Sequence, residues 1–310
     1  MRKLWERLRK KLFPASKRGA SSNGKDSAEV WAALLPSLIR TSAAISFRKS
    51  EAPLEKTRSK FGGTPYLPKD FVWPIYEGKP SENISKAPLA FLAQINLEEL
   101  APFDKEGLLP KKGMLYFFYD ARMVCRGFDP VDKNCAKVYF FDGEKEDLVS
   151  AFPPLPLPEQ AFEEFEISFS EKRSLPAFEE FSSCYFDGEC DFEDYGARCE
   201  KLGVAEAEDG ETGSSKLFGY ADLIQGEMLD DCERISRGVY CGGALRESEE
   251  ERKDILKHSR DWLLLLQLGT IETDGADVMW GDCGKLYFYI KKQDLAERNF
   301  DGAWLILQCC

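Results

Sequence analysis

The chain repeats one order of motifs in its two halves. Each half contains an aromatic-glycine turn, an apolar segment interrupted by one glutamine, and a Gly-x-Leu-Tyr-Phe segment. These motifs occupy residues 61–65, 88–97 and 112–119 in the first half and 218–222, 262–270 and 283–290 in the second. A shared order with similar spacing predicts an internal duplication, in which Gln94 is equivalent to Gln267 and Leu115 to Leu286. A duplicated fold has a pseudo-two-fold axis, and a site near that axis can draw on both halves.

The repeat divides the chain into four segments. Residues 1–27 are predicted to form a basic amphipathic arm with a flexible linker, and residues 152–213 a connector with proline-rich and acidic stretches. The two repeat halves are predicted at 28–151 and 214–310, together forming one compact domain.

Local patterns add expectations for the secondary structure. We expect a helix over 28–40 that Pro36 interrupts, and a strand over 41–49. A charged helix is predicted over 247–260, and a long loop or short helices over 187–213.

Composition and charge exclude several classes of protein. Of the residues, 43% are hydrophobic and 31% charged, which is typical of a globular chain. The net charge of −12 repels phosphate, so we expect no nucleic-acid partner. The ten cysteines include no CxxC pair, and no signal peptide or membrane-length apolar run is evident. These features predict a cytoplasmic protein.

The N-terminal arm has its own pattern. On a helix over residues 1–13, one stripe is apolar and the remaining positions are mostly Lys and Arg. The stripe consists of Met1, Leu4, Trp5, Leu8 and Leu12. One hypothesis is a helix that lies peripherally on an anionic membrane at its inner face. The alternatives are an arm that docks on the protein's own acidic surface and a disordered tail.

Two glutamines stand out because they lie inside apolar strands. An unpaired buried amide costs about 1–3 kcal/mol, so Gln94 and Gln267 must each find partners. The first interpretation is structural, with bonds to backbone near the turns. The second is that both amides, together with Gln225, face a shared groove and bind a ligand. Asp282, before the second Gly-x-Leu-Tyr-Phe segment, could form an Asx-turn or present a carboxylate to the same ligand.

The glycine-rich turns favour a structural role. They lack the lysine and the spacing of a phosphate-binding P-loop. We therefore predict that their conspicuous residues shape the backbone. These structural turn residues are Gly62, Gly63, Trp73, Pro74, Gly219 and Tyr220.

Signatures of metal binding and catalysis are weak. Cys184, Cys190 and Cys199 lie in an acidic stretch, but their spacing fits neither a zinc site nor a calcium-binding loop. His258 is the only histidine, and no nucleophile motif accompanies it. We therefore expect no metal, no cofactor and no catalytic residue.

Several segments carry a resemblance to a known family. They are residues 61–74, 88–100 and 109–120 in the first half and 216–228, 262–268 and 281–290 in the second. They resemble the YwqG-like family of bacterial proteins, also known as the DUF1963 domain, over roughly residues 50–308. The resemblance implies an α+β fold, mainly of antiparallel sheets with an internal duplication, but no established function. Family members often have a histidine just before the second-half turn, where this chain has Ser215.

Three hypotheses for function follow. The first is a non-enzymatic binding or protein-interaction module, with an unidentified small molecule or protein as partner and a site between the halves. The second is an enzyme whose cleft is lined by Asp282 and the glutamines. The third is an immunity-type protein that binds a basic toxin through its acidic body.

Overall fold

A computed structural model describes residues 24–79, 82–157, 162–186, 190–207, 213–273 and 276–309. The predicted amphipathic stripe of Leu4, Trp5, Leu8 and Leu12 lies outside the described residues.

The described chain is α+β with mostly antiparallel strands, which confirms the predicted fold class. The helices are α2 (Gly24–Leu38), α3 (Leu97–Leu100), η2 (Pro130–Asp132), η3 (Lys145–Asp147), α4 (Phe178–Glu180), η4 (Phe181–Tyr185), α5 (Phe192–Leu202), α6 (Leu229–Ser236), α7 (Glu249–Ser259), α8 (Lys292–Ala296) and η5 (Phe300–Gly302). The strands of the main sheet are β1 (Arg40–Lys49), β2 (Lys60–Phe61), β6 (Ala90–Asn96), β7 (Met114–Tyr119), β8 (Ala136–Phe141), β10 (Phe165–Ser174), β11 (Ser215–Leu217), β12 (Trp262–Leu268), β15 (Lys285–Lys291) and β16 (Trp304–Gln308). Short two-stranded pairings join β3 (Tyr66–Pro68) to β9 (Leu148–Ser150), β4 (Ile75–Tyr76) to β5 (Ala87–Pro88), and β13 (Ile271–Thr273) to β14 (Ala276–Val278).

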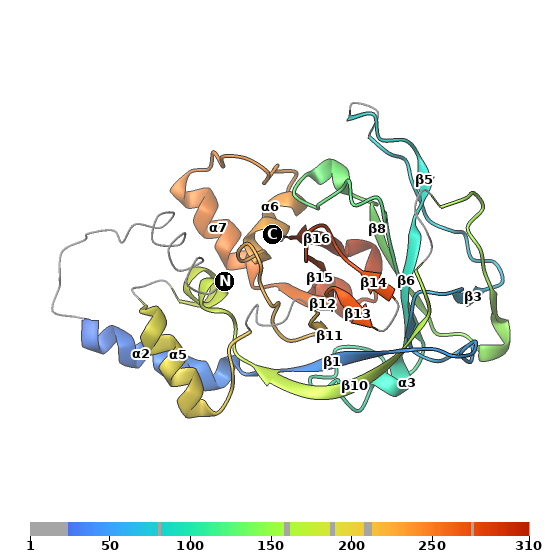
Figure 1. The fold of residues 1–310 in the computed structure, drawn as a ribbon. Helices are drawn as coiled ribbons and strands as arrows, with labels where there is room; N and C mark the ends of the chain where they lie inside the picture. Colours follow the sequence, from blue (N-terminus) through green and yellow to red (C-terminus); the bar gives the residue numbers. More distant parts are fainter. Residues whose placement is uncertain are drawn as a thin grey trace.

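The main sheet has a symmetric strand order. Among the described residues its ten strands run β16-β15-β12-β11-β1-β10-β2-β6-β7-β8. The long strands β1 and β10 pair at its centre and lie side by side in Figure 1. First-half strands continue outward from β10 and second-half strands from β1. The pairing of β1 with β10, and the pairings of β11 with β1 and of β2 with β10, are symmetric about the point where Ser46 lies opposite Ser168.

The outer strands repeat the same register. Gln94 pairs with Tyr116 across β6 and β7, and Gln267 pairs with Tyr287 across β12 and β15. In each pair a β-bulge or irregularity occurs at the same position relative to the glutamine. A bulge shifts which side chains face the core, so both glutamines reach the same place in their halves.

Several local predictions can be compared with the observed elements. The predicted charged helix is α7, which begins with a capping box formed by Ser248 and Glu251. The predicted helix over 28–40 is α2, which begins earlier, at Gly24, and contains Pro36 near its end. The predicted strand over 41–49 is β1. The segment 152–213, predicted as a connector, also supplies the central strand β10, because β10 offers β1 a full-length antiparallel partner.

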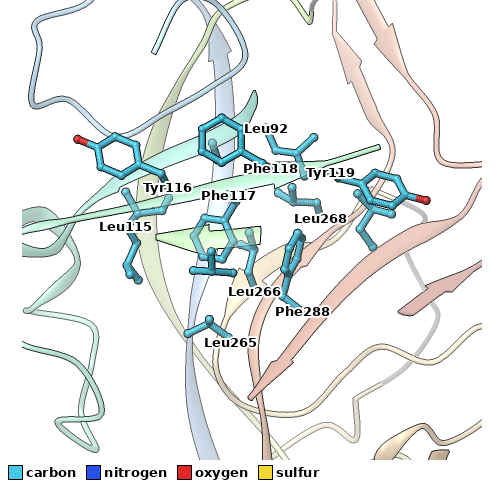
Figure 2. Close-up of a cluster of buried hydrophobic side chains, with 14 of the residues drawn as sticks. Leu92, Leu115, Tyr116, Phe117, Phe118, Tyr119, Leu265, Leu266, Leu268 and Phe288 are labelled. Carbon is cyan, nitrogen blue, oxygen red and sulfur yellow. The ribbon is translucent and has the colours of Figure 1, made fainter. Parts of the chain in front are cut away.

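A shared hydrophobic core fills the space between the two halves. Phe117 of β7 meets Phe288 of β15 edge to face, with ring centroids 5.2 Å apart. Figure 2 shows leucines of β6 and β12 around this contact. Leu115 and Leu286 are both fully buried in the same cluster. Where β8 approaches η5 and β16, the remaining cavity is only about 10 Å³. This small cavity lies at the edge of the interface, beside the exposed Lys133, Asn134 and Asp301, and has no room for a ligand.

None of the helices in the described ranges is long and apolar enough to cross a membrane.

Candidate functional site

Gln94 is fully buried, and its amide is bonded to the segment around the first-half turn. Its Oε1 accepts the Tyr66 N–H at 3.1 Å, and its Nε2 donates to the carbonyls of Lys56 and Arg58 at 2.9 Å each. Both amide protons are thus engaged by protein groups, as the structural interpretation expected. The glutamine fixes the backbone on both sides of β2.

Gln267 makes the equivalent bonds in the second half. Its Oε1 accepts the Asp222 N–H and its Nε2 donates to the Ser214 carbonyl, both at 2.9 Å. A further bond joins Nε2 to Asp222 Oδ2 at 2.8 Å. Because Gln267 is also fully buried, its amide has the same structural role as that of Gln94. A role of either glutamine in ligand binding stays a prediction.

The other predicted ligand-binding residues differ from these two amides in exposure. Gln225 is exposed, and its backbone N–H bonds the side chain of Gln308 at 3.0 Å. Gln308, which the sequence analysis did not single out, is the buried amide that orders this turn through bonds to Ile224 and Gly226. Asp282 is exposed on the turn before β15. Asp282 is thus exposed while Gln94 and Gln267 are fully buried, and a cleft that they share stays a prediction.

The Gly62-Gly63 turn requires glycine because its backbone is left-handed and because other parts of the chain pack closely against it. Both residues are left-handed, with φ of 62° and 68°. A Cβ on Gly62 would lie 2.0 Å from the Glu163 carbonyl oxygen, and one on Gly63 would lie 2.6 Å from Glu164 Oε2. Only glycine therefore lets the chain before β10 cross the turn so closely. This crossing places the Glu164 carboxylate beside Lys60.

Other predicted turn residues have identifiable structural partners. Trp73 is buried and donates its indole N–H to the Leu89 carbonyl at 2.9 Å, while the Pro74 carbonyl accepts the Leu89 N–H at 3.0 Å. In the second half, Gly219 is left-handed and Tyr220 is buried.

The two turns correspond with an offset that the motifs did not show. Matching the aromatic residues equates Phe61 with Phe218, and this alignment is wrong by one residue. Lys60 pairs with Gln94 and Lys216 pairs with Gln267, so Lys60 and Lys216 are the equivalent residues. The aromatic residues suggest the wrong alignment because Phe218 is equivalent to Gly62 and not to Phe61. Phe218 has the same left-handed backbone as Gly62, with φ 62°.

The first-half turn borders a cavity of about 340 Å³ that is open to solvent. We call it the Lys60 cavity. Its lining residues are Ser50, Glu51, Ala52, Pro53, Lys60, Thr64, Tyr66 and Glu164. The segment 50–54 is held over it by bonds from the N–H groups of Ser50 and Leu54 to Glu164, both at 3.2 Å.

Lys60 forms the base of this cavity and is almost completely buried. Its Nζ donates to Glu164 Oε2 at 2.6 Å and to the Thr64 carbonyl at 2.7 Å, and lies 4.9 Å from the centre of the Tyr66 ring. A buried ammonium needs such partners, because desolvating an unpaired charge costs several kcal/mol. The carboxylate of Glu164 is more accessible, with its side chain 20% exposed.

At the equivalent place in the second half, a buried tyrosine replaces the threonine. Tyr220 follows Gly219 where Thr64 follows Gly63, and its hydroxyl donates to the Leu38 carbonyl at 2.6 Å. Arg40 covers the Tyr220 ring at 4.7 Å. The large aromatic residue thus occupies the position at which the small Thr64 borders a cavity.

The second-half lysine has a different carboxylate partner. Lys216 bonds Asp222 Oδ1 at 2.8 Å, and both side chains are buried. Burial alone would raise the pKa of Asp222, but the charge of Lys216 and the bonds from Gln267 and Ser214 lower it. Asp222 therefore stays ionised as part of a closed network.

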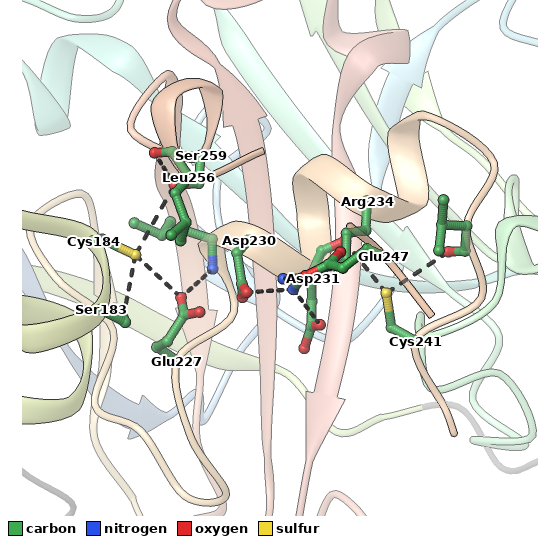
Figure 3. Close-up of polar contacts among 12 residues, drawn as sticks. Ser183, Cys184, Glu227, Asp230, Asp231, Arg234, Cys241, Glu247, Leu256 and Ser259 are labelled. Carbon is green, nitrogen blue, oxygen red and sulfur yellow. Dashed lines mark hydrogen bonds and ion pairs between the residues drawn. The ribbon is translucent and has the colours of Figure 1, made fainter. Parts of the chain in front are cut away.

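A second cluster of polar side chains holds α6 and α7 against η4 (Figure 3). Arg234 bonds Glu247 through two nitrogens at 2.9 Å each and also pairs with Asp230. Cys184 Sγ lies 3.4 Å from Glu227 Oε2. Burial raises the pKa of both Cys184 and Glu227. A thiol that stays protonated is a poor nucleophile, so we interpret this cluster as structural.

The cysteines and histidine weighed in the sequence analysis are dispersed. Cys184 packs in the cluster beneath α6, whereas Cys199 and Cys190 pack with Trp31 in another. Within the described ranges no group of three or more His, Cys, Asp or Glu residues is placed to hold a metal ion. His258 is 38% exposed on α7, with Nδ1 against the Asp254 carbonyl.

Sequence reasoning missed the residues of the Lys60 cavity. The available signal was a lysine two or three residues before a glycine in the turn motif of both halves. Such a lysine must be paired when it is buried. Its partner Glu164 could not be found from spacing, because 104 residues separate the two.

The comparison with protein families covers most of both halves and, of the residues that line this cavity, Lys60, Thr64, Tyr66 and Glu164. A family model described as a domain of unknown function, DUF1963, matches residues 59–309. The chain belongs to the DUF1963 family. The match begins immediately before Lys60 and includes Gln94, Gln267 and Glu164. No curated protein matches this DUF1963 chain.

Proposed function

We propose that this DUF1963 protein is a non-enzymatic binding module and that the Lys60 cavity is its binding site. The observation that carries the proposal is the difference between the halves. The first-half turn borders an open cavity of about 340 Å³ at Thr64, whereas the equivalent position in the second half holds the large, buried Tyr220. This volume is at the lower end of the range typical of small-molecule sites.

The chemistry of the cavity favours binding over catalysis. Lys60 is engaged by Glu164 and Thr64, so its ammonium is not a free nucleophile or base. The chain's single histidine, on α7, is not among the lining residues. A polar wall with one accessible carboxylate beside Tyr66 can orient a small polar ligand.

The symmetry of the sheet supports an internal duplication as part of this proposal. Equivalent registers, equivalent glutamine bonds and equivalent lysines occur in both halves. After duplication one half would keep an open cavity while the other closed around Asp222 and Tyr220. A cytoplasmic, YwqG-like bacterial protein with these features remains our working proposal for its setting.

Native mass spectrometry of the protein purified from its own host tests the binding proposal. The test variant is Thr64→Tyr, which copies Tyr220 into the cavity, and the matched control is Thr64→Ser. A bound mass in the wild type and in Thr64→Ser, but not in Thr64→Tyr, supports the site. Equal bound mass in all three proteins places the ligand elsewhere and overturns it. The proposal is also overturned if no bound mass is found and no compound in a metabolite screen raises the Tm of any of the three proteins.

A further inference from the structure

The charges around the Lys60 cavity differ in how accessible they are. Three lining residues are charged, namely Glu51, Lys60 and Glu164. The Lys60 side chain is only 1% exposed, whereas Glu164 is 20% exposed and Glu51 lies on the surface. A ligand that enters the cavity therefore meets carboxylates and not the ammonium.

The hydrogen bonds of these groups also favour a cationic ligand over an anionic one. Lys60 already donates to Glu164 and Thr64 and faces the Tyr66 ring. An anion could reach it only by displacing those partners and by approaching two carboxylates. The Glu164 Oε1 atom accepts the Leu54 N–H at 3.2 Å, and a carboxylate oxygen can accept a second donor. The described residues that line the cavity therefore offer acceptors, while Lys60, the cation among them, is buried.

The charge of the whole protein acts in the same direction. A net charge of −12 attracts cations toward an acidic opening and repels anions. The cavity of about 340 Å³ has room for a cation the size of a lysine or arginine side chain.

We propose that the Lys60 cavity binds a primary ammonium or guanidinium group, received by Glu51 and Glu164. This inference rests on the proposed binding function and adds the chemical class of the ligand. The cation can come from a free small amine or from a basic side chain of a partner protein. Glu164 is oriented by Lys60 and Leu54, while Glu51 contributes charge at the opening.

Three probes of the same chain length separate the effect of charge from the effect of size. We would titrate the isotope-labelled full chain with butylammonium, butyramide and butyrate, and follow the amide NMR signals of Thr64 and Tyr66. Butylammonium should cause saturable shifts with a Kd on the order of millimolar, because it has few atoms to contribute affinity. Thr64→Tyr should abolish these shifts. Glu51→Gln should weaken binding about three- to tenfold, while the neighbouring surface variant Glu55→Gln should leave it unchanged.

The outcomes distinguish this inference from the proposed function. If butyramide or butyrate binds as well as butylammonium, the cation inference is overturned while the cavity remains a binding site. Equal affinity in Glu51→Gln and wild type also overturns it. If no probe gives saturable shifts, both proposals fail. A tetra-arginine peptide that binds at least tenfold tighter than butylammonium supports a partner's side chain as the source, and equal affinity supports a free amine.

Discussion

Lys60 and Lys216 occupy equivalent positions, each opposite the buried glutamine of the next strand, yet they take their carboxylates from different places. Lys60 is paired by Glu164, which arrives from the chain before β10. Lys216 is paired by Asp222, which lies within its own turn. The local partner closes the second half into a compact network, while the distant partner leaves room for a cavity in the first.

The two glutamines should contribute similarly to stability. Replacing either Gln94 or Gln267 by Leu removes the partner of one backbone N–H and at least one carbonyl. We expect each variant to lose about 1–3 kcal/mol of unfolding free energy, because buried polar groups are left unpaired. Urea melts measure this loss. Gln225→Leu, at an exposed position, should change stability by less than about 0.5 kcal/mol. Unchanged melts of both buried variants would contradict the structural role.

Gly63 should tolerate alanine less well than another left-handed glycine. Gly63 and Gly107 have φ of 68° and 64°, but a Cβ on Gly63 meets Glu164 Oε2 at 2.6 Å whereas one on Gly107 meets nothing within 4 Å. Gly107→Ala should therefore cost only the conformational term, about 1 kcal/mol. We expect Gly63→Ala to cost at least about 1 kcal/mol more, because Glu164 must shift away from Lys60. Equal losses in thermal melts would show that the crowding at the turn is unimportant.

Stability should fall as the pH rises toward and above neutral, in part because of Glu180. This residue is 3% exposed on α4, and burial raises its pKa from 4.5 to about 7, against the lowering effect of Arg40 and Lys216 and a hydrogen bond from Tyr185. A raised folded pKa stabilises the protein fully below the unfolded value, and this contribution is lost as the pH rises through the folded one. The contribution of Glu180 to the unfolding free energy should fall by roughly 3 kcal/mol between pH 4 and pH 8.

The variant Glu180→Gln isolates this effect, because it cannot ionise. Its unfolding free energy should depend less on pH between 5 and 8 than that of the wild type. The neighbouring variant Glu179→Gln is the control and should retain the wild-type slope. Denaturant melts across this range decide the matter, and parallel slopes for all three proteins would refute the assignment to Glu180. Asp231, whose pKa burial raises to about 6, and Glu227, whose pKa burial also raises, should contribute to the slope that remains.

The membrane hypothesis for the N-terminal arm predicts that it binds anionic vesicles. Its stripe of Leu4, Trp5, Leu8 and Leu12 among Lys and Arg residues fits the acyl boundary, and each cation near the surface contributes about 1 kcal/mol. The full chain should float with phosphatidylglycerol vesicles at low salt, whereas a chain that begins at Gly24, the first residue of α2, should not. The same flotation of both proteins would remove the membrane hypothesis, and vesicles of phosphatidylcholine control for charge.

The sequence by itself determined the elements whose pattern is local. Alternating and continuous apolar runs located β6, β7, β12 and β15, and a buried amide inside such a run required that Gln94 and Gln267 be bonded to protein groups. The capping residues Ser248 and Glu251 start α7 where its charge pattern predicts a helix. Such signals are readable because the interacting residues are near one another along the chain.

Only the tertiary structure decided how distant segments combine. It placed β10 at the centre of the sheet and brought Glu164 across the Gly62-Gly63 turn to Lys60. It also set the one-residue offset between the turns, since strand register depends on bulges and partners that no local motif encodes. The small Thr64 borders a cavity, and the larger Tyr220 at the equivalent position is buried against the Leu38 carbonyl. The physical reason is that burial and charge pairing are properties of surfaces that meet only after folding.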